Sequence, residues 1–129
     1  MEVQTDDPAP EAIRAKVRAW YKVKGRDYFA RRLGEFTRQF PWVSEIPPFR
    51  LVHMSRQWGS CSPKGEIILN PHLVKAPRQG IDYVLVHELA HLKHHDHGDE
   101  FWKLVDTHVP DWRRSKHHLD GLVELLLSE

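Results

Sequence analysis

The amino-acid sequence predicts an α+β fold in a single domain. Apolar residues recur at helical spacing in several stretches, and two short stretches, 49–54 and 66–70, have strand composition. Residues 62–65, which read Ser-Pro-Lys-Gly, fit a type I turn that leads into the second of these strands. With 129 residues, the chain is large enough for one modest hydrophobic core.

The composition limits the class of protein. Apolar residues make up 40% of the chain and charged residues 29%, as in ordinary globular domains. A single cysteine, Cys61, excludes an internal disulfide and fits a reducing compartment. The sequence has neither a signal-peptide pattern nor an apolar run of about 20 residues. We therefore expect a soluble, cytoplasmic protein without a membrane partner.

The charge is uneven along the N-terminal third. Residues 1–9 hold three acids and no base, and we expect them to be a flexible acidic segment. Residues 10–40 hold nine bases against three acids, a net charge of +6, and their apolar spacing predicts two helices separated near Gly25 and stopped by Pro41. Their bases form either the solvated face of packed helices or a surface for nucleic acid or an acidic partner.

The middle and the end of the chain predict the remaining elements. The strands at 49–54 and 66–70 should form a hairpin, followed by a break at Asn70-Pro71 and a helix that starts near Ile81. Residues 100–108 and 111–127 should form two further helices, which Pro110 separates. The domain would then run from residue 10 to residue 129, behind the acidic segment.

One motif carries chemistry: His87-Glu88-Leu89-Ala90-His91. On a helix, His87 and His91 lie on one face, one turn apart, so both imidazoles can reach one metal ion. Glu88 is offset around the helix, where its carboxylate can face a water on that metal. Two imidazoles and a carboxylate base favour a catalytic zinc site, which needs a third protein ligand and an open position.

The helix around the motif is largely apolar. Ile81, Leu85, Leu89 and Leu92 follow the spacing of a core face. Buried polar groups without partners are costly, so histidines and a glutamate on such a helix require partners. A bound metal supplies them.

The third ligand should lie just beyond the motif. An unbroken helix would place His94 about 10 Å along the axis from His87, too far to share an ion. We expect the helix to end here, with Gly98 in a left-handed turn, so that His97 folds back towards the motif. His94 and His95 are then solvated or contact the ligands from outside. The other candidates in this stretch are Asp96, Asp99 and Glu100.

The sequence resembles the YgjP-like metal-dependent hydrolases, which are relatives of the SprT-like and WLM zinc peptidases with a zincin fold. The similarity covers residues 49–105 and rests on an ordered series of short motifs. These are Trp58-Gly59-Ser60-Cys61-Ser62, Gly65, Ile67, Leu69-Asn70, Leu73, Pro77, Ile81-Asp82-Tyr83-Val84, His87-Glu88-Leu89-Ala90-His91-Leu92, His97 and Phe101-Trp102.

The resemblance implies a small antiparallel sheet over an active-site helix, zinc on His87, His91 and His97, and Glu88 as the base. It also implies a metallopeptidase that hydrolyses amide bonds in a protein or peptide substrate. The chain departs from the family at Gln57, where arginine is usual, and at His95 and Asp96. It also has a basic helical segment where many members carry a β-rich region.

Further residues are candidates for the surroundings of the site. Tyr83 and His108 could assist at the oxyanion, while Trp58 and Cys61 could lie near the metal or the substrate. Cys61 is either a thiolate close to the metal or a small residue packed in the hairpin. Two alternative functions are a non-catalytic zinc-containing interaction module and a DNA-associated SprT-like protease that uses residues 10–40.

Overall fold

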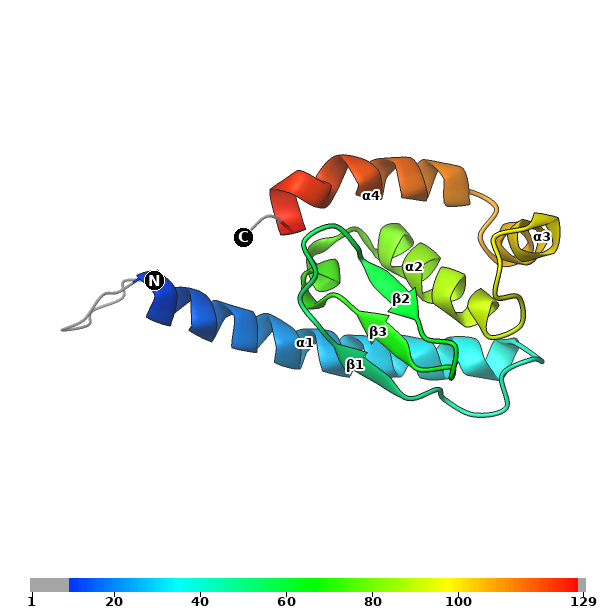
Figure 1. Ribbon diagram of the computed structural model, residues 1–129, viewed down its shortest axis with the longest axis horizontal. Helices are drawn as coiled ribbons and strands as arrows, with labels where there is room; N and C mark the ends of the chain where they lie inside the picture. The colour runs from blue at the N-terminus through cyan, green and yellow to red at the C-terminus, as the bar shows by residue number, and fades with distance from the viewer. Residues whose placement is uncertain (1–9, 128–129) are drawn as a thin grey trace.

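Four α-helices, one 3₁₀ helix and a three-stranded sheet form the part of the chain that the computed structural model describes, residues 10–127 (Figure 1). The predicted α+β class is confirmed, and the acidic segment 1–9 lies outside the described residues. Within residues 10–127, no helix combines the length and the apolar character needed to cross a membrane. The elements are α1 (Pro10–Gln39), β1 (Phe49–Leu51), β2 (Gly59–Cys61), β3 (Ile67–Leu69), η1 (Pro71–Lys75), α2 (Arg78–His91), α3 (Asp99–His108) and α4 (Trp112–Leu127).

The sheet has the strand order β1-β3-β2 and is mixed. β2 pairs antiparallel with β3 and places Gly59 opposite Leu69, whereas β1 runs parallel to β3. The predicted turn is present, because the Gly65 amide donates to the Ser62 carbonyl (2.9 Å) and Gly65 has φ +87°. The strand predicted at 49–54 is present as β1, but its predicted hairpin pairing with 66–70 was wrong, because β1 runs parallel to β3. Residues 52–58 carry the chain across to the other edge of β3, so the strand that forms a hairpin with β3 is β2. The sheet is therefore not purely antiparallel.

α1 is one continuous helix of 30 residues, not the two predicted helices. Glycine within a helix costs only about 1 kcal/mol relative to alanine, so packing can override it. Gly25 is buried, and a Cβ there would lie 3.6 Å from Leu51 Cδ1 of β1 and 3.1 Å from Phe29. The small residue therefore lets α1 lie close against the sheet. The helix ends at Gln39, shortly before Pro41, as expected.

α2 is enclosed by the other elements. In Figure 1 it lies behind β2, between α4 above and α1 below. Leu85, Val86 and Leu89 are fully buried. α4 approaches α2 closely at Gly80, where an added Cβ would lie 3.1 Å from Leu119 Cδ2. The apolar face predicted for the motif helix is thus the centre of the core.

The buried side chain of Asn70 fixes the loop between β1 and β2. Its Nδ2 donates to the carbonyls of Met54 (2.6 Å) and Gln57 (3.0 Å), and its Oδ1 accepts from the His72 amide (3.0 Å). The backbone N–H of Asn70 also donates to the Trp58 carbonyl (2.9 Å). Each such bond contributes about 1 kcal/mol, and together they set where β2 begins.

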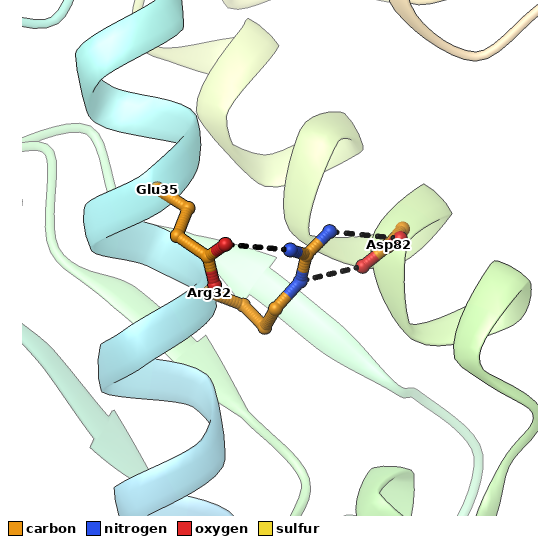
Figure 2. Close-up of polar contacts among 3 residues, drawn as sticks. All are labelled: Arg32, Glu35 and Asp82. Carbon is orange, nitrogen blue, oxygen red and sulfur yellow. Dashed lines mark hydrogen bonds and ion pairs between the residues drawn. The ribbon is translucent and has the colours of Figure 1, made fainter.

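An ion-paired arginine joins α1 to α2 (Figure 2). Nε and one terminal nitrogen of Arg32 donate to the two carboxylate oxygens of Asp82 at 3.1 and 3.0 Å. The other terminal nitrogen lies 3.2 Å from Glu35 Oε2. The side chains of Arg32 and Asp82 are only 12% and 23% exposed, so solvent screens this pair less than a surface pair.

We predict that Asp82→Ala lowers the free energy of unfolding by about 1–3 kcal/mol, because it removes two hydrogen bonds to a charged, largely buried group. Urea denaturation measures the change. The matched control is Glu66→Ala, which breaks the pair between Glu66 and the 60% exposed Arg50. That variant should lose no more than about 1 kcal/mol. Equal losses in the two variants would contradict a special role for the pair between α1 and α2.

Candidate metal centre and active-site cleft

Three histidine rings converge at the C-terminal end of α2. His87 and His91 lie one turn apart on the helix, and the chain turns at 92–93 directly after it. The following loop returns His97 so that its Nε2 lies 3.2 Å from His87 Nε2 and 2.9 Å from His91 Nε2. Gly98 has φ −83° and precedes α3, so the expected left-handed conformation at this position was wrong. The reversal uses the turn at 92–93 instead.

The geometry of the three nitrogens fits a metal ion. Zinc–nitrogen bonds of 2.0–2.1 Å in a tetrahedron place the nitrogens about 3.4 Å apart, close to the separations seen here. Three ring nitrogens that face one another cannot all be satisfied by hydrogen bonds among themselves, because each unprotonated nitrogen needs a donor. A metal ion can accept a lone pair from each of them. In residues 10–127, the group of potential ligands within 4.8 Å of one another contains His87, His91 and His97 and no cysteine or carboxylate.

The opposite nitrogens of two rings have partners that orient them. His91 Nδ1 lies 3.1 Å from the His94 carbonyl, to which it can donate, and His87 Nδ1 lies 3.3 Å from the Tyr83 hydroxyl. Burial, together with the charges of His91 and His97, lowers the pKa of His87 to about 3, and burial also lowers the pKa of His91. Both rings are therefore neutral near pH 7, which is the state that binds metals.

Aromatic side chains of α3 and α4 support the rings. Phe101 is fully buried, and its ring centroid lies 5.0 Å from that of His87 and 4.5 Å from that of His91. Trp102 stacks on the exposed His97 ring at 5.7 Å and on Trp112 at 4.3 Å. His97 lies in a loop outside any helix or strand, so its ring needs side-chain contacts to hold its position. The sequence motif Phe101-Trp102 supplies such contacts.

Glu88 lies beside the histidines but points towards β2. It is only 5% exposed, and burial raises the pKa of its carboxyl to about 8. A Cβ on Gly59 would lie 3.2 Å from Glu88 Oε2 and 3.1 Å from Val84 Cγ1. Only a glycine therefore leaves room for the carboxylate between β2 and α2.

Two cavities meet at His87 and Glu88. The larger, of about 530 Å³, runs between β2 and the histidines, and Ser60, Cys61 and His95 line it. The smaller, of about 160 Å³, lies between Trp58, Tyr83 and the α4 residues Lys116, Leu119 and Asp120. Both cavities are also lined by Gln57 and Gly59. A ligand at the histidines can thus extend into either space.

The structure places the other predicted residues as follows. Trp58 and Tyr83 line the smaller cavity. Cys61 lines the larger one, and its thiol lies 3.6 Å from the Ser62 carbonyl. Burial, with the charge of Glu88, raises the pKa of Cys61 to about 11, which favours a neutral thiol over the thiolate interpretation.

The structure does not bring His108 to the site. Its ring packs against Phe40 at 4.4 Å and Trp42 at 5.6 Å, and it lines neither of the two cavities. Conversely, Lys116 and Asp120 lie in the wall of the smaller cavity although sequence reasoning missed them. They are more than 20 positions from the motif, and the helical spacing of 111–127 indicated only which residues face the core.

The fold and this arrangement define the class of metal-dependent peptidases, and comparisons with known proteins agree. The family model described as YgjP-like, metallopeptidase domain, matches residues 1–121, and the chain belongs to this family. The resemblance inferred from the sequence motifs is thereby confirmed. The crystal structure of the metallopeptidase zymogen of Pyrococcus abyssi abylysin is similar, with a TM-score of 0.61 and 26% identity over 75% of this chain and 94% of that chain. No curated protein matches the chain.

We predict that the purified protein binds about one metal ion per chain and that His97→Ala weakens the binding by more than about 100-fold. Loss of a group that only supports a ligand already costs 10–100-fold. Elemental analysis and competition with a chelating dye measure the stoichiometry and the affinity. His95→Ala is the matched control, because His95 is an exposed histidine of the same loop that also lines the cleft. Metal loss in this control and not in His97→Ala would assign the third ligand to His95.

Proposed function

We propose that the protein is a zinc-dependent peptidase in which His87, His91 and His97 hold the metal and Glu88 is the general base. The observation that carries the proposal is the convergence of three histidine rings on a cleft that also contains a buried carboxylate. The Nε2 atoms of His87 and His91 lie 3.2 and 2.9 Å from His97 Nε2. Three histidines leave one position of a tetrahedral zinc for water or substrate, as in catalytic sites. A non-catalytic zinc module would not require this open cleft.

Glu88 has the position that a general base needs, because it lines both cavities beside the histidines. A zinc ion held there would act as a Lewis acid and would lower the pKa of a coordinated water towards neutrality. The Glu88 carboxylate accepts a proton from the attacking water and then passes it to the amine that leaves the broken amide bond. Burial raises the pKa of this carboxyl and so disfavours its charged form, whereas the positive charge of a bound zinc would favour the carboxylate that accepts the proton. Tyr83 orients the His87 ring through its contact with Nδ1.

The shape of the cleft supports a peptide as the substrate. β2 pairs with β3 on one side only, and Gly59, Ser60 and Cys61 border the larger cavity. The second edge of such a strand can pair with an extended peptide through main-chain hydrogen bonds. The smaller cavity, with Trp58 and Leu119 in its walls, has the size to receive an apolar substrate side chain next to the broken bond.

We predict that Glu88→Gln keeps the fold and the metal but lowers peptide hydrolysis by about 10²–10⁴-fold, the usual contribution of a general acid–base group. Glutamine has the size of glutamate but cannot accept the proton. The assay combines digestion of a peptide library with metal analysis and circular dichroism of the same samples. Undiminished cleavage would refute the mechanism. Loss of the metal together with activity would make Glu88 a ligand or a folding residue.

We also predict that Gly59→Ala lowers hydrolysis by at least about tenfold while the metal remains bound. The added methyl group would lie 3.2 Å from Glu88 Oε2 and 3.3 Å from Leu69 Cδ2, so the carboxylate must shift. Overpacking of this kind also costs about 1–3 kcal/mol of stability, so activity is compared well below the unfolding temperature. Gly121→Ala is the control, because nothing lies within 4 Å of its added Cβ. Wild-type activity in Gly59→Ala would show that Glu88 tolerates displacement.

A further inference from the structure

A groove lies beside α1, and none of the three histidines lines it. It has a volume of about 760 Å³, and it lies between the second half of α1, the connection that contains Ile46 and the first residue of α2. Four arginines line it: Arg31, Arg32, Arg38 and Arg78. None of these residues borders either of the cavities at His87 and Glu88.

The charges of the groove are largely uncompensated. Arg32 is bound by Glu35 and Asp82 (Figure 2), and among residues 10–127 Glu35 is the only carboxylate that lines the groove. Within residues 10–127, no carboxylate forms an ion pair with the exposed Arg31, Arg38 or Arg78. Arg31 instead lies over the Tyr28 ring at 5.3 Å. Three guanidinium groups therefore remain available to an anionic partner.

The wall of the groove also has an apolar part. Ile46 is 52% exposed, and a Cβ on Gly34 would lie 3.4 Å from Ile46 Cδ1. Because Gly34 has no side chain and is itself buried, Ile46 lies close against α1 with about half of its side chain exposed. An apolar group can therefore rest there between the arginines.

We propose that this groove docks an acidic, extended segment of a partner protein. Carboxylates of the segment pair with Arg31, Arg38 and Arg78, since the planar guanidinium matches a carboxylate with two parallel hydrogen bonds. An apolar side chain of the same segment rests on Ile46. A peptide supplies both kinds of group, whereas a phosphate backbone supplies only the charge. The inference concerns binding alone, so it stands independently of the hydrolysis proposed above.

The test is fluorescence anisotropy of the full-length protein with a labelled glutamate-rich peptide that contains one central leucine. Replacement of Arg31, Arg38 and Arg78 by Gln should weaken binding about 10- to 100-fold, because each exposed charge pair contributes about two- to fivefold. Ile46→Ser should weaken it several-fold through lost apolar contact. The matched control replaces Lys16, Lys22 and Arg26 by Gln, which makes the same change in charge on exposed positions of α1 outside the groove. It should change the affinity by less than about threefold.

Three outcomes would overturn the proposal. The first is the absence of peptide binding by the wild-type protein. The second is equal weakening by the two triple variants, which would show attraction to the overall charge of α1. The third is tighter binding of a labelled DNA duplex than of the peptide, lost in the groove variant, which would assign the groove to nucleic acid. Circular dichroism of every variant separates lost binding from lost folding.

Discussion

The close approach of β2 to α2 at Gly59 is the constraint on which the site depends. Any larger residue would press on Glu88, Val84 and Leu69 at once, so these side chains would have to shift. Because β2 lies this close, the cleft has a main-chain wall on one side and the histidine rings on the other. The same contact shields the Glu88 carboxyl from water and raises its pKa. One missing side chain thus sets both the shape and the acid–base chemistry of the cleft.

The approach of β2 is itself held by buried hydrogen bonds. Asn70 is fully buried and ties the carbonyls of Met54, Gln57 and Trp58 to the end of β3. Near the C-terminal end of α2, the Trp42 indole donates to the Leu89 carbonyl at 2.9 Å. Buried polar groups are expensive without partners, so these bonds stabilise one position of the loop and the helix over others. The geometry of the candidate site rests on polar contacts that lie outside the cleft.

The helices and the histidine motif were predictable because their information is local. Helical spacing identified α2, and the residue types of 62–65 identified the turn at Gly65. β2 was not predictable in this way. Gly59, Ser60 and Cys61 have little strand propensity, and they become a strand only because β3 and α2 accommodate them. The continuity of α1 through Gly25 and the position of α4 beside the smaller cavity likewise depend on packing between distant segments.

The three histidines are held by two different means. His87 and His91 are placed by the buried helix α2. This helix is fixed to α1 through Arg32 and Asp82, and to the connection between α1 and β1 through Trp42. His97 has no such support, and the order of its ring depends on stacking with Trp102. A metal bound by all three rings would therefore also stabilise the loop at 92–98, because binding energy is shared with the ordering of the ligands. Since the helix sets two of the three proposed ligands in advance, differences in metal affinity among variants should arise mainly from the loop and from the aromatic residues that pack against it.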